Sequence, residues 1–252
     1  MLLYLKERLS KMTDEGRFFD AIRRVSLEEQ ISCGIGTLSE RSLHKVLKLY
    51  YEPRGEYHEV EFLGCVADIM RDGEIIEIQT GALSKLKGKL ERFLPSSRVT
   101  VVHPITVEKT LCTVMADGTV RRRKSPARGS IYSMAFELYK IRELLLSDNL
   151  IVRVVFLASD EYRYSSRGRH RGEKLNTLPR RVISEMDLST PEDYRVFLPV
   201  GLPEEFTSSE FLAAIKSRSR YDYYAIRLLA HLGIITRTED RGRAHVYKIN
   251  SF

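Results

Sequence analysis

Cysteine is scarce in this sequence. The 252 residues include three cysteines, Cys33, Cys65 and Cys112, and no C-x-x-C pair. An odd number of widely spaced cysteines argues against a disulfide framework and against a structural zinc site. The cysteine content therefore favours a protein of the reducing cytoplasm.

Long apolar stretches are also missing. The apolar start Met1–Leu5 is interrupted at once by Lys6, Glu7 and Arg8, so we expect no signal-peptide core. No stretch approaches the roughly 20 apolar residues that a membrane-spanning helix needs. We therefore expect a cytoplasmic protein without membrane contact.

Acidic residues are too few to balance the basic ones. The chain carries 41 Lys and Arg against 34 Asp and Glu, a formal charge of +7, and 43% of its residues are hydrophobic. This composition excludes a disordered chain. Between Gly118 and Arg181 there are fifteen basic and six acidic residues, a net charge of +9, so the rest of the chain carries −2. A basic middle segment indicates a polyanion as partner.

Hydrophobic spacing predicts alternating helices and strands over the first 160 residues. Helical patterns occupy 2–29, 39–50, 84–93 and 131–146, and strand patterns occupy 57–63, 65–70, 74–80, 98–105 and 150–158, with a hairpin over 110–123. From residue 39 the order is helix, three strands, helix, strand, helix, strand, which is typical of a mixed sheet covered by helices. We therefore predict an α/β fold, α+β overall.

The pattern changes after Ser159. Residues 160–182 are rich in Arg, Gly and Ser and lack periodicity, so we expect a basic segment that becomes ordered only on binding a ligand. Two short helices (208–215 and 221–232) and a strand pair (234–238 and 245–249) then resemble a winged helix-turn-helix. We expect four parts: an N-terminal helical segment (1–36), a sheet-containing core (37–159), a basic connecting segment (160–203) and a winged-helix domain (204–252).

Two acidic residues lie on strands that a tight turn joins. Asp68 is on the strand 65–70, and Glu77 and Gln79 are on the strand 74–80. Side chains alternate along a strand, so Glu77 and Gln79 share one face, and a hairpin can place Asp68 beside them. Two carboxylates can share Mg²⁺ or Mn²⁺, which would activate a water and neutralise charge on a phosphate. Solvated acids at a strand edge are the competing interpretation.

This local order resembles the PD-(D/E)XK nuclease superfamily, the restriction endonuclease-like fold of many restriction enzymes, archaeal junction resolvases and phage-type exonucleases. The resemblance covers 38–158. It implies that Asp68 and Glu77 bind the metal and that Gln79 stands where the superfamily usually has lysine. Glu40, on the first helix of the core, would be a further member of the site.

The glutamine is a departure from the usual pattern. Lysine at that position helps to hold the attacking water or to stabilise the phosphate charge, and glutamine supplies no charge. Some branches of the superfamily read E-x-Q, and Lys85 or Lys87 on the following helix could substitute, so we include Lys87 among the candidate catalytic residues. Loss of catalysis is the alternative.

Other polar residues near these positions allow two interpretations. His44 and Lys48 lie on one face of the helix 39–50, as a functional stripe or as an ordinary exposed set at four-residue spacing. Glu59 and Glu61 share a strand face and could assist the metal site. His103, at a strand end, is expected to be structural.

Basic residues occur in three places that could contact phosphates. They are a cationic loop, the connecting segment, where the rings of Tyr162 and Tyr164 could stack on bases, and the second helix and wing of the winged helix. The candidates are Arg121, Arg122, Arg123, Lys124, Arg167, Arg169, Arg171, Arg218, Arg220, Arg227, Arg241 and Arg243. Solvated charge runs and a protein-binding winged helix are the alternatives.

These features predict a metal-dependent nuclease-like protein that hydrolyses phosphodiester bonds, with DNA favoured over RNA. The first alternative is a catalytically inactive DNA-binding regulator on the same fold, and the second is a protein–protein adaptor. The resemblance also implies a homodimer as one option, because cutting two strands takes two sites.

Overall fold

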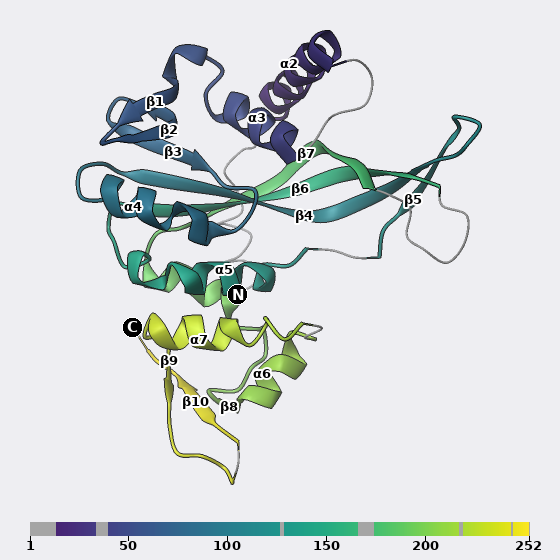
Figure 1. Cartoon of the computed structure of the whole chain (residues 1–252). Helices are drawn as coiled ribbons and strands as arrows, with labels where there is room; N and C mark the ends of the chain where they lie inside the picture. Colours follow the sequence, from purple (N-terminus) through teal and green to yellow (C-terminus); the bar gives the residue numbers. More distant parts are fainter. Residues whose placement is uncertain are drawn as a thin grey trace.

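A mixed sheet organises most of the molecule (Figure 1). The computed structural model describes residues 14–33, 40–126, 129–165, 174–216, 219–242 and 244–251, and within these ranges seven strands form this sheet. The strands are β1 (His58–Phe62), β2 (Cys65–Arg71), β3 (Glu74–Ile78), β4 (Val99–Val114), β5 (Val120–Lys124), β6 (Leu150–Tyr164) and β7 (Lys174–Leu188). Their order is β1-β2-β3-β4-β6-β7, and β5 pairs with β4. The strands β3, β4 and β6 are parallel to one another, and the other pairs are antiparallel.

Helices cover both faces of the sheet. The helices α2 (Glu15–Cys33) and α3 (Glu40–Tyr51) lie on one face, and α4 (Lys87–Phe93) and α5 (Tyr132–Lys140) lie on the other (Figure 1). Neighbouring valines of a central strand point to opposite faces, as Val101 and Val102 do in β4. Because both faces are covered, the central strands are apolar on both sides.

The predicted α/β class and the order of elements from residue 40 to Tyr164 are confirmed. The boundaries differ most in three places. The strand predicted over 98–105 continues to Val114, the strand predicted over 150–158 continues to Tyr164, and the helix predicted over 131–146 ends at Lys140 and is followed by the 3₁₀ turn Arg142–Leu144. β4 and β6 are longer than predicted because they pair with each other along almost their whole length.

The expectation that residues 160–182 become ordered only on binding a ligand is wrong for the part that the structure describes, which lies in β6 and β7. β7 pairs with β6 from Val152↔Leu188 to Arg163↔Lys174, with three irregularities in the register. Tyr50 Oη of α3 donates to Glu185 Oε1 of β7 at 2.9 Å. The expected connecting segment 160–203 therefore includes a full strand of the large sheet.

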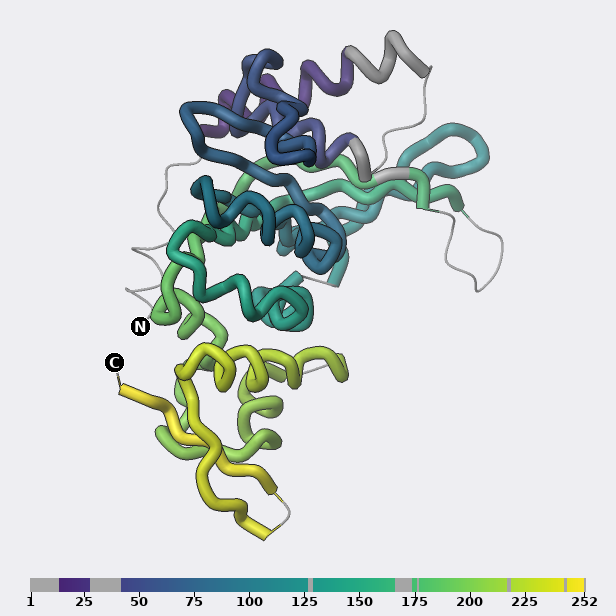
Figure 2. Tube along the Cα trace, turned by 60° about the vertical axis from the view of Figure 1, so that its left-hand side comes forward, coloured from purple at the N-terminus to yellow at the C-terminus, as the bar shows by residue number. Residues whose placement is uncertain are grey.

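The distal parts of four strands extend past the helices. We call residues 108–114 of β4, β5, 159–164 of β6 and 174–180 of β7 the arm; Figures 1 and 2 both show it projecting beyond α4 and α5. Parts of the arm are buried, as at Cys112, Ser159 and Glu161, whereas β5 and Tyr164 are exposed. A sheet segment outside the helical layers need not alternate regularly between apolar and polar side chains. This explains why residues 159–164 and 174–180 show no strand periodicity in the sequence.

The C-terminal unit contains two helices and a small sheet. Its elements are β8 (Glu205–Thr207), α6 (Ser208–Ala214), α7 (Tyr224–His231), β9 (Ile235–Arg237) and β10 (Val246–Ile249), with the strand order β8-β10-β9. α7 lies against α5 (Figure 2), where the Phe136 ring is 4.7 Å from the rings of both Tyr221 and Tyr224. Buried residues of the unit and of the sheet domain form one continuous hydrophobic cluster.

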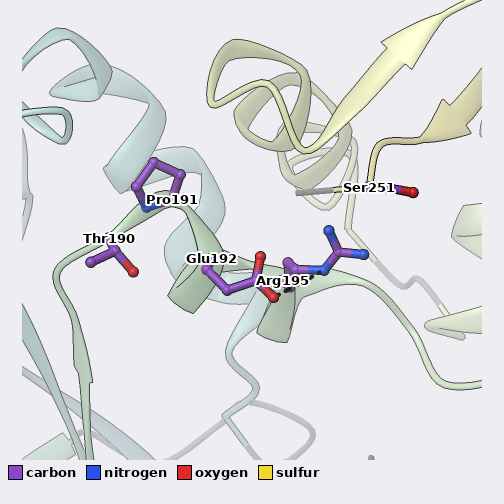
Figure 3. A pocket seen from close by; sticks show the side chains of 5 residues that line it. All are labelled: Thr190, Pro191, Glu192, Arg195 and Ser251. Atoms are coloured by element: carbon purple, nitrogen blue, oxygen red, sulfur yellow. Dashed lines mark ion pairs between the residues drawn. The ribbon is translucent and has the colours of Figure 1, made fainter.

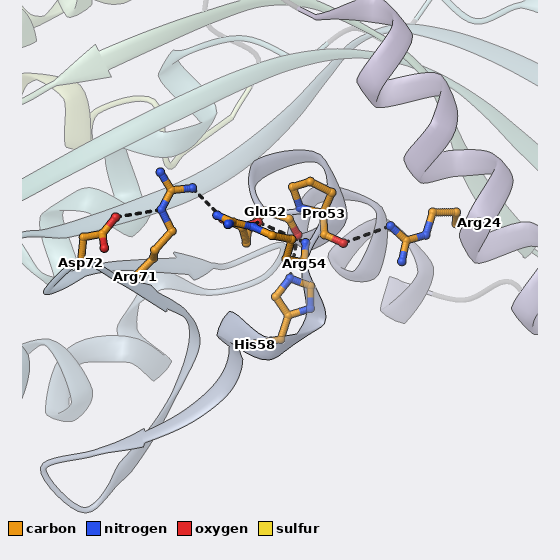
Figure 4. Close-up of polar contacts among 7 residues, drawn as sticks. All are labelled: Arg24, Glu52, Pro53, Arg54, His58, Arg71 and Asp72. Atoms are coloured by element: carbon orange, nitrogen blue, oxygen red, sulfur yellow. Dashed lines mark hydrogen bonds and ion pairs between the residues drawn. The ribbon is translucent and has the colours of Figure 1, made fainter.

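Polar contacts join elements at two opposite sides of the molecule. The Arg195 guanidinium, in the 3₁₀ helix η4 (Pro191–Phe197), donates to the carbonyl oxygen of Asn250 at 3.0 Å, beside an open pocket of about 500 Å³ (Figure 3). At the opposite side of the molecule, the buried Glu52 carboxylate after α3 binds the guanidinium groups of Arg54 (2.9 Å) and Arg71 (2.8 Å) (Figure 4). These charge-assisted hydrogen bonds join the end of α3 to β2 and lower the pKa of Glu52 to about 2.

Membrane insertion by a helix finds no support here: within the described ranges, no helix is both long and apolar enough to cross a bilayer.

At Gly129, where the chain returns from the arm to the core, the backbone packs closely against β4. A Cβ atom at this position would lie 2.6 Å from both Ile105 Cγ2 and the carbonyl oxygen of Thr106. We expect Gly129→Ala to lower the free energy of unfolding by about 1–3 kcal/mol, because backbone must move to admit the methyl group. Urea denaturation measures the effect. Gly88→Ala in α4 is the control, because a Cβ there meets nothing within 4 Å, and it should be neutral or stabilising; equal losses from both variants would contradict the close packing of Gly129.

Candidate functional site

Asp68 and Glu77 meet where β2 and β3 separate. The backbone ladder between the strands runs from Arg71↔Glu74 to Ile69↔Ile76 and ends there. Beyond it, the amide of Ile78 donates to Asp68 Oδ2 at 2.7 Å, and the amide of Asp68 donates to Glu77 Oε1 at 3.3 Å. The two carboxylates thus replace carbonyl partners of the opposite strand, and the strands diverge at this point.

A nitrogen-bearing side chain from each face of the sheet approaches the two acids. His44 Nε2 of α3 is 3.1 Å from Asp68 Oδ2. Lys89 Nζ of α4 is 2.6 Å from Glu77 Oε2, and the Glu77 side chain is 1% exposed. A carboxylate so deeply buried needs a charged or hydrogen-bonding partner, and Lys89 supplies it.

The environment separates the pKa values of the two carboxyl groups. Burial raises the pKa of Glu77 to about 7, and the neighbouring Asp68 charge adds to this, although the Lys89 ammonium opposes it. Burial also acts to raise the pKa of Asp68, but the hydrogen bonds from His44 and from the Ile78 amide bring it below its ordinary value. Near neutral pH the pair therefore carries between one and two negative charges.

Gln79 is held by its own hydrogen bonds. Its side-chain Nε2 donates to the carbonyl oxygen of Ala82 at 3.0 Å, and its backbone carbonyl accepts from Nδ1 of His103 at 2.7 Å. Burial lowers the pKa of His103, so this imidazole is neutral at physiological pH. His103 thus positions the end of β3, as the structural interpretation of this residue predicted.

A cation-lined pocket opens beside the acids. It has a volume of about 470 Å³ and is lined by His44, Lys45, Lys48, Glu59, Gln79, Thr80, Gly81 and Lys85. Lys48 forms an ion pair with Glu59, which leaves Lys45 and Lys85 as further cationic side chains of the wall. Such a lining favours an anionic group in the pocket.

The predicted catalytic residues do not all come together. Asp68, Glu77 and Gln79 are neighbours, Lys85 lines the pocket, and Lys87 points away to an exposed ion pair with Glu91 at 3.9 Å. Glu40 is the first residue of α3, and its side chain lies outside the described part of the structure. Glu61 is exposed on β1.

The sequence analysis missed Lys89 and also Lys45 of the pocket wall. Lys89 follows Lys85 by four positions, so both lie on the same side of the helical segment, whereas Lys87 is two positions from either and points elsewhere. In the sequence, Lys85 and Lys89 directly precede Leu86 and Leu90, which are buried. This shared four-residue spacing could have indicated that both lysines lie beside the core.

The cationic loop predicted before α5 is a strand. Arg121, Arg122, Arg123 and Lys124 are exposed residues of β5, paired with β4, and Arg122 lies 3.6 Å from Asp160. Arg167, Arg169, Arg171, Arg218 and Arg243 lie outside the described residues.

The predicted groove-entering helix, α7, contacts α5 on one side. α7 has four buried residues among eight and packs against α5. The Arg227 guanidinium stacks over the rings of Tyr139 (5.7 Å) and Tyr224 (5.6 Å), and Arg220 donates to Tyr221 Oη at 2.9 Å. On the wing, Arg241 is 3.7 Å from Glu205 and remains mostly exposed.

The comparison with known proteins places the chain in a family. Residues 41–189 match the family described as a domain of unknown function, DUF8091. The chain belongs to this family. An uncharacterized protein of Treponema pallidum (strain Nichols) is 32% identical over 223 residues, covering 85% of this chain and 87% of its own length. No solved structure matches the chain. The matched region contains His44, Asp68, Glu77, Lys89 and the arm.

The raised pKa of Glu77 makes a prediction about pH dependence. The folded state binds this proton up to about pH 7, whereas the unfolded chain releases it near 4.5, so stability is lost as the pH rises through that interval. Glu77→Gln should match the wild type near pH 4 and exceed its free energy of unfolding near pH 8 by on the order of 2 kcal/mol. Urea denaturation in a chelator measures this; parallel pH curves for the two proteins would contradict the assignment.

Proposed function

We propose that this chain is a metal-dependent nuclease-like protein that hydrolyses phosphodiester bonds in DNA. The observation that carries the proposal is the buried pair Asp68 and Glu77 beside a pocket walled by Lys45 and Lys85. Paired carboxylates and cationic walls are the two features that a phosphate and its activating metal ion need together.

The order of elements supports the PD-(D/E)XK interpretation. Helix α3, the strands β1 to β3, α4, β4, α5 and β6 follow one another in the order of that superfamily's core. Asp68 is on the second strand, and Glu77 begins the E-x-Q sequence at the end of the third. The order of α6, α7, β9 and β10 likewise supports a winged helix, with the wing rather than α7 exposed to a partner.

The residues present fit Mg²⁺ or Mn²⁺. Within the described ranges, no three His, Cys, Asp or Glu side chains are arranged to hold a metal ion. Mg²⁺, however, is commonly held by one or two carboxylates together with substrate phosphates and water. Asp68 and Glu77 supply two such oxygen donors. Burial is the main cause of the raised pKa of Glu77 and the Asp68 charge adds to it, and a bound cation would offset both. When bound, the ion would activate a water molecule and neutralise phosphate charge.

The other side chains have distinct roles in this proposal. Lys45 and Lys85 hold a phosphate at the pocket wall, and His44 orients Asp68 through its 3.1 Å contact. Lys89 supplies the positive charge that Gln79 does not. Gln79, tied to Ala82, shapes the pocket floor.

One observation favours a catalytically inactive DNA-binding protein as the second candidate. Lys89 already neutralises Glu77, at 2.6 Å, and the amide group of Gln79 is engaged with the backbone. A protein of this kind would bind DNA through its basic surfaces without needing the metal ion. Calorimetric titration with Mn²⁺ separates the candidates, because heat of binding that Asp68→Asn removes is expected only for the nuclease.

Cleavage is the direct test of the nuclease. We expect nicking or degradation of supercoiled, linear or branched DNA with Mg²⁺ or Mn²⁺, and a loss of at least about 100-fold in Asp68→Asn and in Glu77→Gln. RNA of the same sequence serves as the second substrate. Glu91→Gln, an exposed acid on α4, is the matched control and should cleave at the wild-type rate. Activity that survives in both acid variants would refute the site.

Lys89 and Lys87 provide a paired test of the positive charge. Lys89→Ala should reduce the cleavage rate about 100-fold, because it removes the charge nearest the acids, and should tighten Mn²⁺ binding, because a competing cation leaves Glu77. Lys87→Ala should change neither quantity. Rates and calorimetric affinities measure the two effects; equal behaviour of the two variants would remove Lys89 from the site.

A further inference from the structure

One face of the arm carries aromatic and cationic side chains together. Arg122 Nη2 donates to Tyr162 Oη at 3.4 Å, so both side chains are on the same face. Tyr164 lies two positions farther toward the tip of the arm, and Lys124, on the antiparallel strand β5, lies two positions toward the core. Both therefore share that face, on either side of Arg122 and Tyr162. Tyr164 is 53% exposed, and the side chain of Arg122 is 61% exposed.

Edge protection does not explain this surface. Lysine and arginine on an exposed edge strand prevent pairing with other chains, and this accounts for the charges of β5. The tyrosines are on β6, however, which has β4 on one side and β7 on the other. The exposed ring of Tyr164 and the half-buried ring of Tyr162 on this inner strand contribute nothing to edge protection, so they need another explanation.

The width of the arm argues against insertion into a DNA groove. At the level of Cys112, four strands lie side by side through the pairs Cys112↔Arg122, Cys112↔Tyr162 and Tyr162↔Asn176. Four strands at about 4.8 Å spacing make a surface about 15 Å wide, and the major groove, about 12 Å wide, admits a two-stranded ribbon. A broad sheet face with aromatic residues on an inner strand instead suits unpaired bases.

We propose that the arm binds single-stranded nucleic acid, with Tyr162 and Tyr164 stacking on successive bases and Arg122 and Lys124 contacting the backbone. Successive residues on one face are about 7 Å apart, which permits neighbouring bases to stack on the two rings. The inference rests on the proposed function, because it names the form of nucleic acid delivered to the carboxylate site.

The continuity of β4 connects the arm to that site. The amide of Gln79 donates to the Val102 carbonyl at 2.9 Å, and Cys112 lies ten residues farther along the same strand. Ten residues of strand span about 33 Å. A single strand of 20 nucleotides is therefore long enough to occupy both surfaces, and substrates with unpaired ends or branches would be favoured.

Fluorescence anisotropy in EDTA tests the arm without any contribution from metal-dependent cleavage. The probes are a 20-nucleotide single-stranded DNA, the RNA of the same sequence, and the blunt DNA duplex. We expect at least one single-stranded probe to bind about 10-fold more tightly than the duplex, and Tyr164→Ala to weaken that binding about 10-fold. Tyr164→Phe, which retains the ring, should stay within about two-fold of the wild type.

Further variants separate stacking, charge and catalysis. Arg122→Ala should weaken binding and reduce the salt slope by about one, whereas Arg98→Ala, at an exposed arginine outside the arm, should not. Tight binding to duplex, or equal affinities of Tyr164→Ala and Tyr164→Phe, would overturn the inference. Asp68→Asn should bind like the wild type, so a protein that binds single strands but never cleaves them refutes the nuclease and leaves the arm assignment standing.

Discussion

The burial of Glu77 in an otherwise apolar layer constrains much of this structure. A carboxylate at 1% exposure needs compensation, and it comes from Lys89 of α4, from the amide of Asp68, and from partial protonation. Because Asp68 accepts from Ile78 and His44, the same cluster fixes the end of β3 and the face of α3 that meets it. Each carboxylate accepts a hydrogen bond from a backbone amide of the facing strand, in place of a carbonyl group. The β2–β3 hairpin is therefore open at this end, and the pocket lies beside the opening.

The long strands β4 and β6 join this site to the arm. Their first halves are apolar on both faces and lie beneath helices, while their second halves leave the helices and form the arm. Charges near the core are largely paired: Glu52 binds Arg54 and Arg71, and Arg153 binds Asp187. The basic residues of β5 are instead exposed. The excess positive charge of the chain is thus concentrated where it can act on a polyanion at a distance.

Much of the sheet could be predicted from the sequence because its strands alternate or are continuously apolar, and because Asp72-Gly73 and Asp117-Gly118 mark hairpin turns. β7 could not, since its arm portion, residues 174–180, lies outside the helical layers and lacks a regular alternation, although Val182, Met186 and Leu188 farther along the strand are buried. Asp68 and Glu77 were found through the hairpin that joins them. Lys89 was missed because its pairing with Glu77 depends on how α4 packs against β3. Residue spacing alone shows which face of the helix Lys89 lies on, but it does not show which residue that face meets.

The surroundings of α7 depend on tertiary packing in the same way. Local pattern identifies two helices and a strand pair, but it does not show which helix face another domain covers. Here the Phe136 ring of α5 lies 4.7 Å from the rings of Tyr221 and Tyr224, and these ring contacts stabilise the contact between α5 and α7. The C-terminal unit consequently behaves as a support for α5, and α5 in turn packs beneath the sheet that carries Glu77. Removing this unit would therefore disturb the carboxylate site through packing, even though no residue of the unit touches the acids within the described ranges.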